Sequence, residues 1–151
     1  MIVTPLDMKV PTQIGDFVVN PASWADFSGP VPANTWFLAY TFWNLDYKIV
    51  KVKDKGFQVR VACTLSKKSW HDQECESERL LRHEYGHYLI ACLSALSFRR
   101  EANERGKKTL KLEQYESYCS RLLKEMINKF AKLQQKYDKD TNHYIRQKEQ
   151  D

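Results

Sequence analysis

The segment 82–90 reads R-H-E-Y-G-H-Y-L-I and places two of the chain's four histidines in the pattern H-E-x-x-H. Residues four apart lie on the same face of an α-helix, so the imidazoles of His83 and His87 can converge on one point. Two imidazoles placed in this way suit two ligands of a tetrahedral zinc ion. Glu84 lies about 100° further round the helix, where it can act as a general base on a water at the metal.

The residues around this motif favour a buried helix. They form an apolar run that is wider than one helical stripe: Leu80, Leu81, Tyr85, Leu89, Ile90, Ala91, Leu93, Ala95, Leu96 and Phe98. Such a helix is buried on most sides, and buried polar groups need partners because unpaired ones are costly. A metal ion would satisfy both histidines. The alternative is that His83 and His87 are hydrogen-bonded core histidines, with Glu84 as a cap or as the partner of an arginine.

The length and composition predict one domain over residues 1–151. The chain is 42% hydrophobic and 28% charged, and it is long enough to bury about two-thirds of its unfolded surface. No apolar run can span a bilayer, and residues 1–5 lack the features of a signal peptide. We therefore expect no transmembrane segment, and these features alone leave the compartment open.

The net charge of +5 does not favour a nucleic-acid partner. Lysines in 48–55 alternate at strand spacing, and the C-terminal lysines alternate with apolar helix positions, so both groups read as solvated faces. A nucleic-acid groove would interleave bases with exposed aromatic residues. The four cysteines have no C-x-x-C spacing, which disfavours a thiolate zinc site. Cys92 and Cys119 are expected to be buried free thiols, although a disulfide stays open for a secreted protein.

The first third of the chain predicts an arm followed by strands. Residues 1–33 contain every proline and are interpreted as an irregular N-terminal arm with short extended pieces at 17–19 and 24–27. An aromatic-rich composition and period-two patterns predict antiparallel strands at 35–42, 47–52 and 57–64, with a hairpin turn at 54–56. We expect the aromatic residues of 34–47 to fill the core face of this sheet and not to line a groove.

Two long helices follow. With Asp72 as N-cap, the first is expected from 73 to at least 98, continuing as far as Arg105 with Gly106 as its stop. Apolar residues spaced three or four apart from Tyr115 to Tyr137 predict a second helix, antiparallel to the first. Residues 137–144 read as a turn or loop. The predicted fold is α+β and zincin-like: an antiparallel sheet, then two packed helices, the first carrying H-E-x-x-H.

The third metal ligand is expected downstream of the motif. The metzincin pattern fails because Ile90 and Leu93 stand where it needs Gly and His. Antiparallel helices return the C-terminal tail to the motif, which makes His143 the best-placed third ligand. A glutamate from the second helix, Glu113 or Glu116, is the alternative.

The chain carries W-x-x-F at 24–27, S-W at 69–70, H-E-x-G-H at 83–87 and Y-D-x-x-T-x-H at 137–143. Over about residues 22–145, these motifs resemble a known bacterial family, domain of unknown function 922. Members are described as secreted or membrane-associated zinc metallopeptidases. The resemblance implies that His83, His87 and His143 bind the metal, that Glu84 is the catalytic glutamate and that the protein is periplasmic or secreted, with its leader absent from this chain. The cytoplasm stays an alternative. Tyr144 stands where the family has a glycine.

The expected activity is hydrolysis of an amide bond in a peptide or protein substrate by a zinc-activated water, with Glu84 moving the proton. Tyr144 is the predicted second donor to the oxyanion, ahead of Tyr137 and Tyr118.

Asp138 or Asp140 is expected to orient a ligand imidazole. The alternative function is a zinc-stabilised, non-catalytic binding module, because few residues remain for the wall of a cleft. The sequence does not indicate the oligomeric state.

Overall fold

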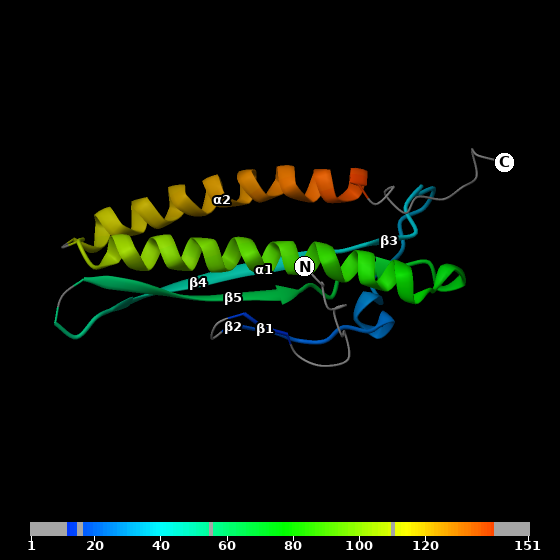
Figure 1. Ribbon diagram of the computed structural model, residues 1–151, viewed down its shortest axis with the longest axis horizontal. Coiled ribbons are helices and arrows are strands. Elements are labelled where there is room, and N and C mark those ends of the chain that lie inside the picture. The colour runs from blue at the N-terminus through cyan, green and yellow to red at the C-terminus, as the bar shows by residue number, and fades with distance from the viewer. Residues whose placement is uncertain (1–11, 15–16, 55, 110, 141–151) are drawn as a thin grey trace, which may run out of the picture.

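Two long antiparallel helices and a β-hairpin form the body of the protein (Figure 1). The computed structural model describes residues 12–14, 17–54, 56–109 and 111–140. Helix α1, Glu78–Gly106, lies between α2, Leu112–Asp140, and the hairpin. The architecture is therefore α+β, and the two helices pack antiparallel as the sequence predicts. None of the described helices is long and apolar enough to cross a bilayer.

The strands form antiparallel pairs and not the single sheet that the sequence predicts. The pairs are β1 with β2 (Thr12–Ile14, Phe17–Val19), β3 with β6 (Ala39–Tyr40, Trp70–His71) and β4 with β5 (Trp43–Lys51, Phe57–Leu65). Strand β5 matches its prediction, and β4 begins several residues earlier than predicted. The expected strand at 35–42 contains only the two-residue β3, which pairs with β6, and Thr41 after it bonds to Glu84 of α1.

The hairpin turn lies where the sequence places it. Val52 donates its N–H to the carbonyl of Gly56 at 3.0 Å, and Gly56 has φ +87°, a region that L-residues with side chains rarely adopt. A Cβ on Gly56 would lie 2.4 Å from the carbonyl oxygen of Gly106. The turn therefore packs against the C-terminal end of α1.

The N-terminal arm differs from its prediction at one position. Residues 17–19 are extended, as β2, but Trp24–Phe27 form a short 3-10 helix, η1, instead of an extended piece. Asp26 accepts a hydrogen bond from the N–H of Ser23 at 2.8 Å and donates its own N–H to the Ser23 carbonyl. This local S-x-x-D pairing closes a turn and explains the difference.

The first helix begins later than predicted because two caps follow each other. Asp72 accepts from the N–H of Glu74 and caps a short 3-10 turn, η2, Gln73–Cys75. Ser77 then accepts from the N–H of Leu80 at 3.0 Å and starts α1. At the other end of the pair, α2 continues to Asp140, so the start of the predicted turn 137–144 is helical, and its remainder lies outside the described residues.

The apolar core has two clusters, one between β2, the hairpin and α1, and one between the hairpin, α1 and the first half of α2. Helix α2 buries Tyr115, Cys119, Leu122 and Met126, and all four belong to one apolar cluster. Beyond Met126 no residue of α2 up to Asp140 is fully buried. The last turns of α2 therefore meet α1 through polar side chains, and these contacts build the site below.

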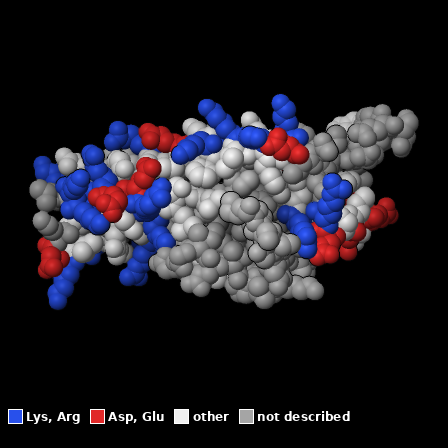
Figure 2. Space-filling view, in the orientation of Figure 1, with Lys and Arg blue, Asp and Glu red and all other residues white. Residues whose placement is uncertain are grey.

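Cys92 and Cys119 are buried free thiols, as the sequence predicts. Cys63 and Cys92 meet between β5 and α1, where the hydrogen bond that the Cys63 thiol donates to Cys92, together with burial, raises the pKa of Cys63. Lysine and arginine side chains gather most densely at the left end of Figure 2, over the hairpin turn and the α1–α2 connection. This basic end is the end of the helix pair farthest from the polar contacts between α1 and the last turns of α2.

Candidate metal centre

The second and third turns of α1 bring the histidines of the motif together. His83 and His87 have ring centroids 5.0 Å apart, because residues four apart share one helix face. His83 and Glu84 are both 4% exposed. Burial at this level requires that each polar group has a partner.

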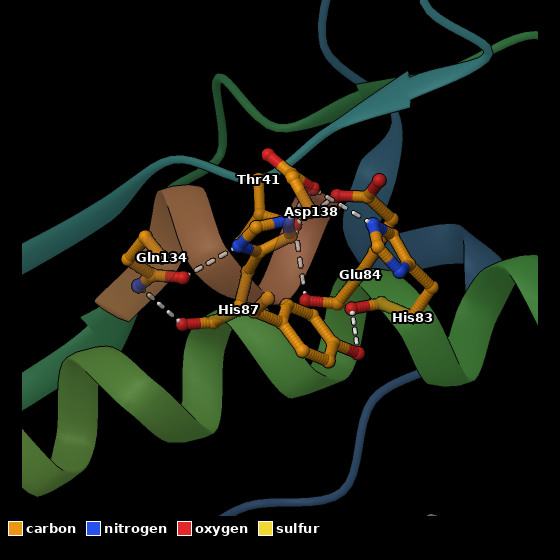
Figure 3. A network of polar contacts seen from close by, with 7 residues as sticks. Thr41, His83, Glu84, His87, Gln134 and Asp138 are labelled. Carbon is orange, nitrogen blue, oxygen red and sulfur yellow. Dashed lines mark hydrogen bonds and ion pairs between the residues drawn. The ribbon is translucent and has the colours of Figure 1, made fainter. Parts of the chain in front are cut away.

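Asp138 of α2 faces both imidazoles (Figure 3). Its Oδ1 lies 3.0 Å from Nε2 of His83 and 2.6 Å from Nε2 of His87. One donor atom from each of these residues lies within 4.8 Å of the others, so the group could hold a metal ion. In the described part of the chain, no other cluster of His, Cys, Asp and Glu has this arrangement.

Gln134 fixes the orientation of the His87 ring. Its side-chain N–H donates to the carbonyl of His87 at 2.9 Å, which leaves the amide oxygen, an acceptor, beside Nδ1 of the ring. Nδ1 must therefore carry the proton, and the lone pair of a neutral His87 lies on Nε2, which faces Asp138. A lone pair and a carboxylate at this distance repel each other unless a proton or a metal lies between them.

Tyr137 locks the other histidine. Its ring stacks on His83 with centroids 4.8 Å apart and planes at 11°, and its hydroxyl donates to the His83 carbonyl at 2.8 Å. Gly86 makes room for this ring, because a Cβ there would lie 2.1 Å from the Tyr137 hydroxyl oxygen. The last turns of α2 thus dock on α1 at the motif itself.

Glu84 is held by a residue from the segment between β3 and β4. The hydroxyl of Thr41 lies within hydrogen-bonding distance of Oε2 of Glu84 and, at 3.1 Å, of its carbonyl. Burial raises the pKa of the Glu84 carboxyl, the Thr41 hydrogen bond and the nearby His87 lower it, and Asp138 raises it. The net effect of these causes raises the pKa of Glu84 above its ordinary value, which makes its carboxylate a stronger proton acceptor.

A pocket of about 330 Å³ opens beside these residues. Glu84, His87 and Asp138 lie on one side of it, and Gln134 and Gln135 of α2 border it. The remaining lining comes from the start of β4 and the chain before it: Phe37, Ala39, Tyr40, Thr41 and Trp43. A small molecule or a side chain can therefore reach the carboxyl and the imidazole from outside.

The structure unites some of the predicted site residues and separates others. Asp138, expected only to orient an imidazole, is close enough to be a ligand. Glu113 and Glu116 lie near the start of α2, more than about 30 Å from Asp138 at 1.5 Å per residue. They are therefore too far away to be ligands of this site. His143 and Tyr144 lie outside the described residues, so their roles stay predictions.

The other predicted oxyanion donors are engaged elsewhere. The guanidinium carbon of Arg105 lies 5.1 Å from the centre of the Tyr118 ring, toward the basic end. The hydroxyl of Tyr137 donates to the backbone carbonyl of His83, so this residue positions His83. Sequence reasoning missed Gln134 and Thr41. Gln134 had a usable signal, because it lies one turn before Asp138, whereas Thr41 had none.

The chain matches a known protein family. A family model described as bacterial protein of unknown function, DUF922, matches residues 22–144. The match covers the helix pair, the hairpin and the segment that carries Thr41. Comparisons with curated proteins and with solved structures gave no match.

Proposed function

Because the chain belongs to the bacterial DUF922 family, whose description names no activity, we propose its function from the site: a zincin-like, zinc-dependent hydrolase of peptide or related amide bonds. The single observation that carries the proposal is the pocket that opens onto Glu84, His87 and Asp138. A buried histidine pair that served only the fold would need no such opening.

The donor set fits zinc. Two imidazole nitrogens and one carboxylate oxygen form one of the ligand sets that catalytic zinc accepts, with a further position left for water or substrate. His87 is held in the tautomer that directs its Nε2 lone pair at the group, as ligand histidines require. When bound, the ion would supply Lewis acidity that lowers the pKa of a water and polarises the scissile carbonyl.

The residues of the chain divide the remaining work. Glu84 accepts the proton of the attacking water and delivers it to the leaving amine. Thr41 holds one of its carboxylate oxygens, which keeps the carboxyl turned toward the pocket. Tyr137 and Gln134 fix the backbone and ring of the two histidines, so the site is ordered before substrate arrives.

His143 separates this proposal from a zinc-stabilised binding module. Three protein ligands leave an open position, whereas a fourth closes the tetrahedron and is typical of structural zinc. If Asp138 and His143 both bind, the site is structural. If only one of them binds, the site stays open for chemistry, and the other residue orients a histidine.

The test is hydrolysis of a peptide mixture by the zinc-loaded protein, followed by mass spectrometry. Replacing Glu84 by Gln keeps the shape of the side chain but removes its basicity, so we expect turnover to fall by at least about 100-fold with zinc content unchanged. Glu101→Gln, an exposed change on the same helix, is the matched control and should leave turnover intact. Equal turnover of the Glu84→Gln variant and the wild type, or no cleavage by the zinc-loaded wild type, would refute the proposal.

A further inference from the structure

The segment before β4 exposes an unusual group of aromatic side chains. Contrary to the expectation that they fill the core of a sheet, five of them are at least a third exposed: Trp36 at 53%, Phe37 at 38%, Tyr40 at 43%, Phe42 at 41% and Trp43 at 36%. Three of these rings are in contact: Tyr40 is centred 5.8 Å from Phe37 and 4.8 Å from Phe42. A large contiguous patch of exposed apolar side chains commonly marks a binding surface.

Part of this patch forms a wall of the pocket at the candidate metal centre. Phe37, Tyr40 and Trp43 line the same pocket as Glu84 and His87. Trp36 and Phe42, their neighbours in sequence, do not line it. The patch therefore has an inner part that lines the pocket beside Glu84 and His87, and an outer part that lies outside the pocket.

The wall is held on fixed backbone. Ser69 bonds both the N–H and the carbonyl of Phe42 through its hydroxyl, at 2.9 and 3.0 Å. The carbonyl of Leu38 accepts a hydrogen bond from the N–H of Asp72 at 2.7 Å, and Tyr40 pairs with Trp70 between β3 and β6. These bonds fix the backbone that carries the aromatic rings before any ligand binds, which lowers the entropic cost of binding.

We propose that Phe37, Tyr40 and Trp43 form a subsite for one large apolar side chain, aromatic or aliphatic, of a peptide substrate next to the bond that is cut. This inference rests on the proposed hydrolase function. A volume of about 330 Å³ is at the lower end for ligand pockets and suits one side chain better than a long segment.

The charges around the pocket support an apolar ligand. No lysine or arginine is among the described lining residues, and the acidic side chains among them are Glu84 and Asp138. An acidic side chain would be repelled there, whereas an apolar one gains from burial against the rings. Sugar rings also stack on aromatic side chains, and the test includes them as a competing ligand.

The experiment measures binding of small probes to the full chain by NMR titration, with and without added zinc. We expect N-acetyl-phenylalanine amide to bind roughly tenfold or more tightly than N-acetyl-alanine amide and than N-acetylglucosamine, whether or not zinc is present. Phe37→Ala should remove this preference. Trp36→Ala, the adjacent exposed aromatic residue outside the pocket, is the matched control and should keep it. Trp43→Ala is the second variant, with the same expected loss.

Equal binding of the phenylalanine and alanine probes would overturn the subsite, and so would a preference that survives both Phe37→Ala and Trp43→Ala. Stronger binding of N-acetylglucosamine would replace the peptide side chain by a carbohydrate and would also overturn it. Because the probes are also tested without zinc, where the proposed hydrolysis does not occur, these results do not depend on catalysis. A hydrolase failure with intact probe binding is therefore distinguishable from a subsite failure with intact hydrolysis.

Discussion

Replacing Gly86 by Ala tests whether the end of α2 is docked on the motif. In an exposed helix this change stabilises by about 1 kcal/mol, because alanine is the better helix former. Here the new Cβ would lie 2.1 Å from the hydroxyl oxygen of Tyr137 and 2.6 Å from the ring carbon that carries it. The ring must move away, and it then loses its hydrogen bond to the His83 carbonyl.

The magnitude follows from these opposing effects. Overpacking a close contact costs about 1–3 kcal/mol, and the lost hydrogen bond costs about 1 kcal/mol more. Against the gain in helix propensity, we expect Gly86→Ala to lower the free energy of unfolding by about 1–3 kcal/mol. In a Tyr137→Leu background the obstacle is gone, and the same change should raise the free energy of unfolding by about 0.5–1 kcal/mol.

The assay is urea unfolding of the four proteins of this double-mutant cycle, followed by circular dichroism. The reversal of sign is specific to contact between Gly86 and Tyr137, since helix propensity alone gives the same sign in both backgrounds. If Gly86→Ala stabilises the wild type as much as it stabilises the Tyr137→Leu protein, α2 does not pack here as described, and the placement of Asp138 fails with it.

Three further changes probe the site and the turn. Gln134→Leu removes the amide that orients a ligand imidazole, so zinc affinity measured by chelator competition should fall about 10–100-fold, while Gln135→Leu leaves it unchanged. Thr41→Val leaves the buried carboxyl of the motif without its hydroxyl donor and should lower the free energy of unfolding by about 1–3 kcal/mol, unlike Thr64→Val on the exposed face of β5; equal effects would contradict the hydrogen bond. Gly56→Ala introduces a Cβ at φ +87° against a backbone oxygen and should lower the melting temperature, which an unstrained turn would not show.

Local signals were enough to predict the helices and the hairpin. The apolar spacing from Tyr115 to Tyr137 and the terminal Gly106 fixed the two helices closely, and their packing followed from a short connection. The start of α1 was missed because Asp72 and Ser77 are both competent caps, and the sequence does not say which one begins the long helix.

The site was predictable on α1 and only partly predictable elsewhere. His83 and His87 share a face by helix geometry alone. Asp138 was interpreted as a turn residue because the apolar stripe ends at Tyr137, but the helix continues and keeps Gln134, Tyr137 and Asp138 on the face toward α1. Polar docking of this kind leaves no hydrophobic period in the sequence.

The contacts from β3 and β4 depend on the tertiary fold. Thr41 meets Glu84 across 43 residues of chain, and no local pattern predicts such a pair. The aromatic residues nearby carry the composition of a buried strand, yet the structure exposes them beside the pocket. A propensity for β-structure describes a half-buried surface and does not say whether protein or ligand covers it.

The most direct test of the account is zinc content after loading and removal of excess metal, by mass spectrometry, for the wild type, Asp138→Ala and Asp140→Ala. Asp140 is the matched control because it pairs with Lys136 on the exposed side of the same helix. We predict about one zinc per chain for the wild type and for Asp140→Ala, and a clear loss for Asp138→Ala. A wild type that retains no zinc, or an Asp138→Ala variant that retains as much as the wild type, would contradict the metal centre described above.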